Sequence, residues 1–229
     1  MISVITPTAD RPVGFALCER FIARQTMIPD EWIVADGGQT PARCTMGQVH
    51  IHEQRPPGAA NFAHNLLNGI KAARGDVLIV CEDDDWLAPD HIATLAAALD
   101  RPGALLAGDD RQNYYNVAHR CHRSFANVGA SLCQTAMKRG ALGVFEHVIR
   151  QCLAAGKFGI DRALWEGIAK AQWSITGKQT CIGIKGLPGQ AGLGIGHRPA
   201  GLRWQADPDL AKLREWIGDD ADAYAEFAT

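Results

Sequence analysis

Short apolar segments alternate with amphipathic segments over the first 110 residues, and this alternation constrains the fold more than any other feature. Apolar segments of strand length lie at residues 2–6, 32–35, 49–52, 77–81 and 104–107. Segments with the three- and four-residue apolar spacing of a helix lie at residues 13–25, 59–74 and 89–99. The segment at 77–81 is apolar throughout, as expected for a strand covered on both faces. The pattern predicts a doubly wound α/β fold in which a mostly parallel central sheet has helices on both faces.

The pattern changes after residue 110. Here the sequence predicts a hairpin at 112–122, a glycine-interrupted helix at 136–155, a helix at 161–172 and a strand at 179–185. Residues 186–196 contain five glycines and are expected to form an irregular, mobile loop. Asp207-Pro208 predicts the start of a final helix to about residue 217, followed by a frayed acidic tail. We expect a single domain, 1–229, made of a first half (1–110), a second half (111–200) and a C-terminal helix and tail (201–229).

The composition is that of an ordinary globular domain, with 229 residues of which 47% are hydrophobic and 21% charged. The most apolar stretch, 77–81, is far shorter than the about 20 residues of a membrane-spanning helix. The first residues lack a basic segment and a small-residue cleavage site, so we expect no secretory signal. Seven scattered cysteines without a Cys-x-x-Cys pair predict reduced thiols in a cytoplasmic protein.

The net charge of −2 hides an asymmetry along the chain. Residues 1–110 contain 8 Lys and Arg against 15 Asp and Glu, whereas residues 111–185 contain 11 against 3. One interpretation is that the protein has two faces with different partners. The other is that the charges scatter over the surface once the chain is folded.

Polar residues follow three of the predicted strands, where a parallel sheet binds its ligands. The strongest signal is the acidic run 82–85, directly after the apolar strand at 77–81. Crowded carboxylates repel one another unless a cation lies among them, and oxygen ligands suit Mg²⁺ or Mn²⁺. The alternative is a solvated turn that also caps the helix beginning near Pro89. Thr6-Pro7-Thr8 and Asp36-Gly37-Gly38 follow two other strands, although Asp36 alone is also typical of an Asp-Gly turn.

Four motifs in register resemble the family 2 glycosyltransferases of the GT-A fold. They are Ser-Val-Ile-Thr-Pro-Thr-Ala-Asp-Arg-Pro (3–12), Trp-Ile-Val-Ala-Asp-Gly-Gly (32–38), Asn65 through Ala-Arg-Gly-Asp (73–76), and Cys-Glu-Asp-Asp-Asp-Trp-Leu-Ala-Pro-Asp (81–90). The resemblance covers about the first 110 residues in order and spacing, and several motifs together are more specific than any one of them. It implies that the first half binds a nucleoside-diphosphate sugar, with a UDP-sugar favoured.

The resemblance also implies roles for residues of the first half. By this likeness, the donor-binding residues are Thr6, Pro7, Thr8, Arg11, Asp36, Asn65, Arg74, Glu82, Asp83 and Asp84. Within this set Asp36 would contact uracil or its equivalent. The segment Glu82-Asp83-Asp84 stands where the family has Asp-x-Asp. Asp84 would then be the direct ligand of Mn²⁺ or Mg²⁺. The sequence departs from the family at Glu82, which replaces the first Asp, and at His64, where many members have Arg.

The second half resembles the family more loosely. Family members carry a Glu-Asp pair whose Asp deprotonates the acceptor, and Asp161 stands in this place with Ile160 for the Glu. Asp161 is therefore the candidate base for an inverting transfer, or alternatively the N-cap of a helix. The loop 186–196 resembles one that closes over the donor, so that His197 would ligate the metal and Arg198 would pair with the diphosphate; alternatively both are ordinary surface residues.

The basic second half favours an anionic acceptor, such as a phosphorylated glycan, an anionic lipid head group or nucleic acid. Lys138, Arg139 and Trp165 are candidate acceptor contacts, although Trp165 is also typical of a core residue. Small transferases of this kind resemble phage-encoded enzymes that act in the host cytoplasm, some of which glycosylate hydroxymethylated pyrimidines in DNA. Tyr114, Tyr115 and Phe125, which lie among Arg and His residues, suit a nucleic-acid surface.

Three alternatives remain open at this point. The chain could transfer sugar to a surface glycan or a lipid-linked saccharide, or bind a nucleotide sugar without turnover. A sugar-nucleotide nucleotidyltransferase would share the strand–helix rhythm and the divalent metal. It would need a glycine-rich basic loop after the first strand, and residues 6–11 contain no glycine.

Overall fold

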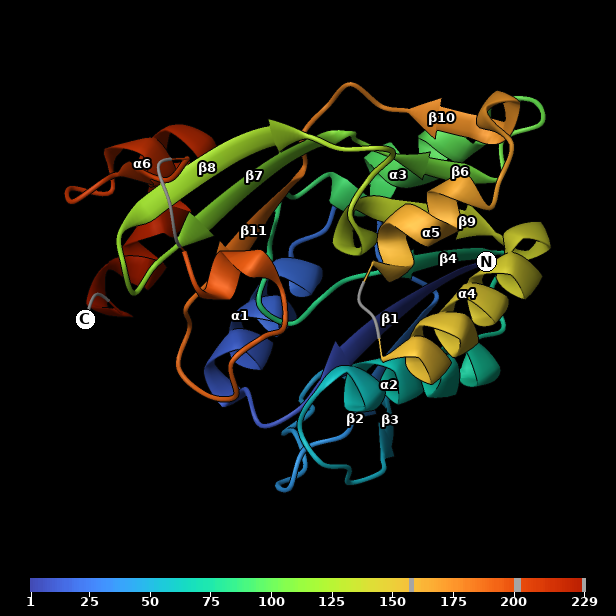
Figure 1. Cartoon of the computed structure of the whole chain (residues 1–229), viewed down its shortest axis with the longest axis horizontal. Helices are drawn as coiled ribbons and strands as arrows, with labels where there is room; N and C mark the ends of the chain where they lie inside the picture. Colours follow the sequence, from blue (N-terminus) through green and yellow to red (C-terminus); the bar gives the residue numbers. More distant parts are fainter. Residues whose placement is uncertain (157–158, 200–202, 228–229) are drawn as a thin grey trace.

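The computed structural model describes residues 1–156, 159–199 and 203–227. Within these residues, the central sheet has seven strands in the order β10-β6-β9-β4-β1-β2-β3 (Figure 1). They are β1 (Ile2–Thr8), β2 (Glu31–Asp36), β3 (Val49–His52), β4 (Val77–Val80), β6 (Leu106–Gly108), β9 (Thr135–Lys138) and β10 (Trp173–Ile175). β1 pairs in parallel with β2 and β4, and the pairs β2–β3 and β6–β10 are also parallel. The predicted mostly parallel sheet is confirmed.

Helices cover both faces of this sheet, as predicted. α1 (Pro12–Ala23) and α3 (His91–Leu99) pack on one face, and α2 (Ala59–Ala72), α4 (Leu142–Ala155) and α5 (Ile160–Glu166) pack on the other (Figure 1). Successive strand residues alternate between the two cores: Val4 joins the core beneath α1, and Ile5 joins the core beneath α2. Because both faces of the sheet are covered, its central strands are rich in apolar residues, and β4 is apolar throughout.

Strand β9 corrects the prediction of a helix from residue 136. It lies between β4 and β6 and is antiparallel to both. Ala136 and Met137 are good helix formers, so residue preference indicates a helix there. Both side chains are fully buried on opposite faces of the sheet, and pairing with the two neighbouring strands decides the structure. The helix itself, α4, begins only at Leu142.

A second sheet packs beside the α1 face. Within the described residues it has five strands in the order β12-β8-β7-β11-β5. They are β5 (Trp86–Leu87), β7 (Arg111–Asn116), β8 (Cys121–Ala126), β11 (Cys181–Lys185) and β12 (Gln205–Ala206). β7 and β8 form the predicted hairpin, and β11 runs parallel to β7 with its carboxyl end at Lys185. This sheet brings residues of the second half to the carboxyl ends of β1 and β4.

Helix ends differ from the predictions at two places. α2 ends at Ala72, two residues before the predicted end at residue 74. A Cβ atom on Gly75 would lie 2.5 Å from Oγ of Ser3, so glycine is needed there for close approach to β1. α5 ends at Glu166 rather than near residue 172, because the chain turns at 170–172 to enter β10. Short 3₁₀ helices complete the chain at Leu132–Gln134, Arg139–Ala141, Lys170–Gln172, Ile195–His197 and Gly218–Phe227.

The C-terminal tail is ordered against the body, which corrects the prediction that it frays. α6 (Ala211–Ile217) has its first turn capped by Asp207, whose carboxylate accepts the N–H groups of Lys212 and Leu213. In the tail, Tyr224 is buried in the same core as α1. Asp220 accepts a hydrogen bond of 2.7 Å from Nε1 of Trp86. A buried polar anchor therefore holds this acidic segment.

Candidate active site

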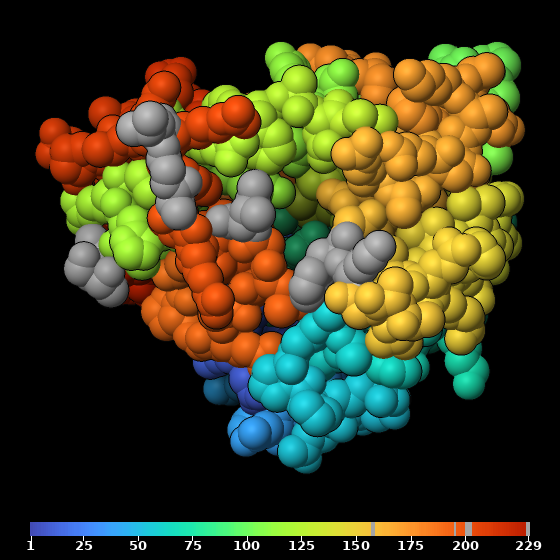
Figure 2. All heavy atoms as spheres, viewed as in Figure 1, coloured from blue at the N-terminus to red at the C-terminus, as the bar shows by residue number. Residues whose placement is uncertain are grey.

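A cavity lies at the carboxyl ends of β1, β4 and β11. Figure 2 shows the molecule hollowed here, between the orange loop that follows β11 and the cyan end of α2. The first half contributes Pro7, Thr8, Ala9, Arg11, Gly58, Asn61, Phe62, Asn65, Glu82, Asp83, Asp84 and Asp85. The second half contributes Tyr114, Ser131, Leu132, Cys133, Gly159, Ile160, Asp161, Lys185, residues 190–194 and His197. The predicted ligand edge of the sheet is thus the edge where the two halves meet.

Asp83 holds the first strand and the first helix together at this edge. Its carboxylate accepts hydrogen bonds of 2.6 Å from Oγ1 of Thr8 and 2.7 Å from Nη1 of Arg11. Asp83 is 2% exposed, so both of its oxygens are occupied within the protein. Its direct role is to orient Arg11, which lies between it and Asp84.

Asp84 is surrounded by positive and imidazole groups. Its carboxylate lies 3.2 Å from Nη1 of Arg11, 3.3 Å from Nζ of Lys185 and 3.3 Å from Nε2 of His197. Burial alone would raise the pKa of Asp84, but the charges of Lys185 and Arg11 lower it well below its ordinary value. Asp84 is therefore ionised at neutral pH, which is the state that a metal ligand needs.

At Glu82 and Asp85, in contrast, the nearby positive charges do not outweigh the effect of burial on the pKa. Burial and the charge of Asp85 raise the pKa of Glu82 to about 8. Burial raises the pKa of Asp85 to about 6, although Lys185 donates to its Oδ1 at 2.8 Å. The second oxygen, Oδ2 of Asp85, is buried and has no hydrogen-bond partner in the described part of the chain. Additional positive charge beside Glu82 and Asp85 would stabilise the ionised form of both carboxyl groups.

These residues fit a divalent cation. Glu82, Asp84 and Asp85 each offer a carboxylate oxygen, and the three oxygens lie within 4.8 Å of one another. An all-oxygen set suits Mg²⁺ or Mn²⁺, and the unpartnered Oδ2 of Asp85 supplies a buried lone pair. His197 can add an imidazole, because burial lowers its pKa and so favours the neutral ring.

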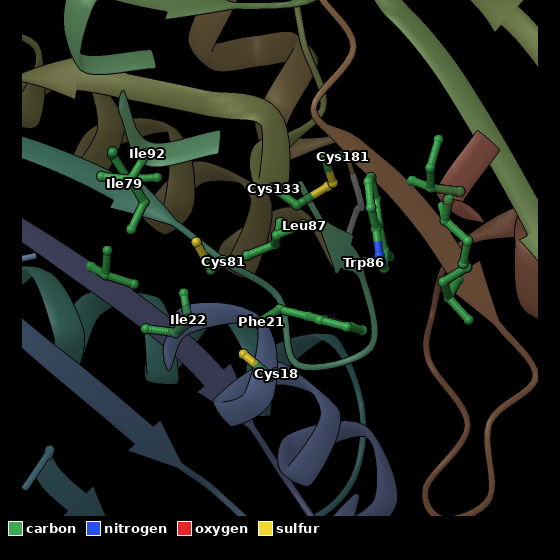
Figure 3. Packing of buried hydrophobic residues seen from close by; sticks show 14 of the residues in the cluster. Cys18, Phe21, Ile22, Ile79, Cys81, Trp86, Leu87, Ile92, Cys133 and Cys181 are labelled. Atoms are coloured by element: carbon green, nitrogen blue, oxygen red, sulfur yellow. The ribbon is translucent and has the colours of Figure 1, made fainter. Parts of the chain in front are cut away.

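A second possible ligand group, Asp85 with Cys133 and Cys181, fits a metal less well. Figure 3 shows the two cysteine side chains pointing toward one another within the core, next to Leu87. The hydrogen bond between the two thiols and their burial raise the pKa of Cys133 well above its ordinary value. Burial likewise raises the pKa of Cys181 against the hydrogen bond. Both thiols are therefore protonated, and all seven cysteines are free.

Asp161 lies in the first turn of α5 and lines the same cavity. The N-cap of this helix is Gly159, with a φ of 113°, so Asp161 is not the cap residue. Its Oδ1 accepts the N–H of Arg162 at 2.8 Å. Partial burial raises the pKa of Asp161 above its ordinary value. A carboxylate in this state is more basic than an exposed one, as a general base requires.

Asn65 reaches the cavity from α2 as expected from its motif. It is 2% exposed, and its Nδ2 donates to the carbonyl of Thr8 at 3.0 Å. Its Oδ1 is buried without a hydrogen-bond partner among the described residues. A ligand hydroxyl could supply the missing donor.

Two expected nucleoside contacts do not line the cavity. Thr6 is fully buried and accepts a hydrogen bond of 2.9 Å from Nε1 of Trp32. Asp36 is 1% exposed, and its carboxylate accepts the backbone N–H groups of Gly38 and Ala42. The Asp-Gly turn that the sequence left open as the alternative is what the structure shows at Asp36.

Three other expected site residues do not line the cavity, which corrects their assignment. Arg74 pairs with Glu31 at the amino-terminal end of β2, the opposite edge of the sheet. Lys138 lies opposite Val77, where β4 begins, and Arg139 donates to backbone carbonyls just before that strand. The sequence indicates a helix where Lys138 and Arg139 lie at the end of β9, and it therefore could not show that these two residues are far from the site.

Trp165 and Arg198 also differ from expectation. Trp165 is 0% exposed and donates to Oγ1 of Thr135, so it is a core residue. Arg198 is exposed and does not line the cavity.

The sequence reasoning missed two contributors to the site. Lys185 contacts Asp84 and Asp85 from the end of β11, and its signal was a charge that directly follows a short apolar strand. The backbone of Gln190 is the other contributor. Its carbonyl accepts Nε of Arg11 at 3.0 Å, and its N–H donates to the carbonyl of Asp10 at 3.1 Å. The glycine-rich segment after β11 is thereby held across the cavity.

Comparison with known sequences identifies the family. The sequence pattern of Glycosyl transferase family 2 matches residues 3–165. The chain belongs to this family. A relative is the uncharacterized glycosyltransferase YwdF of Bacillus subtilis (strain 168), 31% identical over 110 residues, covering 43% of this chain. The matched region makes up 38% of that relative's length.

Solved structures of low sequence identity support the same fold. Staphylococcus aureus TarS superposes with a TM-score of 0.54 at 11% identity, covering 80% of this chain and 36% of TarS. The 1–349 portion of TarS in complex with UDP-GlcNAc superposes with a TM-score of 0.51 at 11% identity, covering 88% of this chain and 61% of that one. The fold is thus the GT-A fold of the family. Among the helices of the described residues, none combines the length and the apolar character needed to cross a membrane.

Proposed function

We propose that this member of family 2 transfers a sugar from a nucleoside diphosphate to an acceptor hydroxyl with the help of a divalent cation. The observation that carries the proposal is the cavity in which ionised Asp84 lies beside the carboxyl groups of Glu82 and Asp85, with Asp161 in the same lining. Family membership and the GT-A fold supply the reaction class. TarS, which shares the fold, binds UDP-GlcNAc, which favours a UDP-sugar.

Asp84 is the central metal ligand in this proposal, joined by Glu82, Asp85 and His197. Mn²⁺ or Mg²⁺ held there would neutralise the negative charge that develops on the departing diphosphate. Asp83 fixes Arg11 against Asp84 through its 2.7 Å contact, so the guanidinium is oriented before the donor binds. Thr8, Pro7 and the free Oδ1 of Asn65 provide the wall against which the nucleoside moiety lies.

Asp161 is the proposed base. The acceptor hydroxyl gives its proton to the carboxylate while its oxygen forms a bond to the anomeric carbon of the sugar. The bond between that carbon and the diphosphate oxygen breaks, and the diphosphate leaves with the electron pair. Attack from the face opposite the leaving group inverts the configuration. The raised pKa of Asp161 suits proton uptake near neutral pH.

The acceptor side carries an aromatic series that favours a planar, negatively charged acceptor. Tyr114, on β7, lines the cavity. Its ring packs edge-on against that of Phe125 on the neighbouring strand β8, with 5.2 Å between the ring centroids. The guanidinium of Arg123 lies 4.8 Å from the Phe125 centroid. A hydroxymethylated pyrimidine of DNA would combine a ring that stacks on such side chains with backbone phosphates for arginine. A phage-encoded enzyme acting on DNA in the host cytoplasm is the corresponding biological setting.

Ligand binding tests the donor assignment. We expect Mn²⁺ together with either UDP or GDP to raise the unfolding temperature, whereas the free nucleosides have little effect. At a hundredfold excess over the dissociation constant, a ligand stabilises the folded state by about 2.7 kcal/mol. Loss of the shift when EDTA replaces Mn²⁺ would support the metal site. If no diphosphate stabilises the protein with either Mn²⁺ or Mg²⁺, the transferase proposal fails.

Acceptor transfer is a separate test. The protein is incubated with the diphosphate sugar that it binds and with DNA containing hydroxymethylated or unmodified pyrimidines, and mass spectrometry measures the modified base. Transfer to the hydroxymethylated DNA alone, weakening steeply as salt rises, supports a DNA acceptor. Transfer to a phosphorylated glycan instead, with none to DNA, would retain the transferase and replace the acceptor.

A further inference from the structure

Lys185 places a buried ammonium in the lining of the cavity. It is the last residue of β11 and is 6% exposed. Its Nζ lies 2.8 Å from Oδ1 of Asp85, 3.3 Å from Oδ1 of Asp84 and 5.6 Å from the ring centroid of Tyr114. The strand pairing of β11 with β7 fixes its backbone, so the side chain enters the cavity from the second half of the chain.

The two cations beside Asp84 differ in how firmly they are held. The guanidinium group of Arg11 bonds to Asp83, Asp84 and the carbonyl of Gln190, so its planar donor set is spread over three partners. The ammonium of Lys185 has three donors on a flexible stem, and the two carboxylates take two of them. Its contact with Asp84 is the longer of the two. Lys185 can therefore turn toward a ligand while it stays anchored to Asp85.

We propose that Lys185 binds the diphosphate of the donor as a cation built into the protein, anchored by Asp85 and placed beside the metal ligand Asp84. The inference rests on the proposed function, because it requires a nucleoside diphosphate in this cavity. Nζ lies 3.3 Å from the Asp84 oxygen, so a phosphate oxygen that approaches a cation on Asp84 comes within reach of Lys185. The ammonium would supply positive charge to the diphosphate whether or not a metal is bound.

Calorimetric titration of the full chain with UDP, GDP and the corresponding nucleosides tests this, with Mn²⁺ and separately with EDTA. The variant Lys185→Met keeps the length of the side chain and removes its charge. We expect diphosphate affinity to fall about tenfold to a hundredfold under both conditions, as for loss of a charge-assisted hydrogen bond, and nucleoside affinity to change little. Lys185→Arg should retain most of the affinity. Lys178→Met, which removes an exposed lysine paired with Asp90, is the matched control and should bind as the wild type does.

A second variant guards against a folding defect. Lys185→Met leaves Asp85 unpaired, whereas Lys185→Met combined with Asp85→Asn removes both charges and should fold. Because Asp85 is also a proposed metal ligand, the double variant is compared in EDTA, where it should show the same selective loss of diphosphate binding. Unchanged diphosphate affinity in either folded variant would overturn the inference, and so would an equal loss for nucleoside and diphosphate, which would mark Lys185 as structural. If the wild type binds neither diphosphate, the proposed function and this inference both fall.

Discussion

Nε2 of His197 lies 3.3 Å from Oδ2 of Asp84, although one follows the glycine-rich loop and the other follows β4. This contact joins the two halves of the chain at the proposed metal site. The charges of Lys185 and Arg11 also hold the pKa of Asp84 well below its ordinary value, against the effect of burial. Its loss should therefore be felt strongly at the site.

Asp84→Asn is expected to abolish the Mn²⁺-dependent stabilisation by a nucleoside diphosphate. The amide keeps the shape but supplies no charge to a metal, so turnover should fall by at least about a hundredfold. Thermal unfolding with and without Mn²⁺, together with a transfer assay, measures both effects. Asp76→Asn is the control, because Asp76 is exposed at the opposite edge of the sheet. Normal metal-dependent binding by Asp84→Asn would remove Asp84 from the site.

The carboxylates beside Asp84 should make the stability of the metal-free protein depend on pH. Burial raises the pKa of Glu82 to about 8 and that of Asp85 to about 6, above their values in the unfolded chain. At Glu82 the folded state then binds more protons than the unfolded chain, so the free energy of unfolding should fall as pH rises from about 6.5 to about 8, above the range in which buried His91 has its effect. One coupled proton contributes up to about 1.4 kcal/mol per pH unit. Unfolding in urea with EDTA across this range measures the slope.

Two variants decide whether this slope comes from the acidic cluster. Glu82→Gln should flatten the upper part of the range, and Glu53→Gln, at an exposed surface position, should not. Saturating Mn²⁺ should reverse the trend, since the metal binds the ionised carboxylates. A slope that persists in Glu82→Gln, with or without metal, would locate its origin elsewhere.

Gly192 allows the loop to cross the ring of His197. A Cβ atom at Gly192 would lie 2.0 Å from Nε2 of His197, the same atom that faces Asp84. Gly192→Ala should therefore displace His197 and weaken Mn²⁺ binding several-fold, with the stability of the core unchanged. Gly194→Ala is the matched control, because a Cβ there meets nothing within 4 Å and its φ of −69° suits alanine. Equal behaviour of the two variants in a Mn²⁺ titration would contradict this role of the loop.

Asp220 anchors the tail and should matter for stability rather than for catalysis. Burial would raise its pKa, but hydrogen bonds from Arg24 and Trp86 lower it overall. Asp220→Ala leaves the buried Nε1 of Trp86 and the Arg24 guanidinium without this partner, which should cost about 2–3 kcal/mol. The loss should shrink as pH falls toward the pKa of Asp220, because the wild-type carboxylate is then protonated too. Denaturation of Asp220→Ala beside the exposed control Asp219→Ala measures it, and equal stabilities would refute the anchor.

The sequence predicted strands such as β4 well, because burial on both faces requires a continuous apolar segment. It also predicted the acidic cluster that follows β4. It failed where tertiary pairing overrides local preference, since Ala136 and Met137 indicate a helix but lie in β9 between two strands. For the same reason the sequence did not show that Lys138 lies at the edge of the sheet where β4 begins, opposite the cavity. Lys185 could not be placed from the sequence, because it meets Asp84 and Asp85 through the pairing of β11 with β5, the strand that directly follows those two residues.

The last prediction concerns Asp161, the proposed base. Its carboxylate lines the cavity and is not the helix cap, so Asp161→Asn should leave the fold and the donor affinity unchanged. Transfer should fall by about 10² to 10⁴, the range that general-base catalysis contributes. Single-turnover transfer measured beside equilibrium donor binding separates the two effects, and Glu166→Gln, on the exposed side of the same helix, is the control. Because the pKa of Asp161 is raised, the wild-type rate should also increase as pH rises through that pKa, and the dependence should vanish in the variant. Full transfer by Asp161→Asn would exclude Asp161 as the base and with it the inverting displacement drawn from this residue.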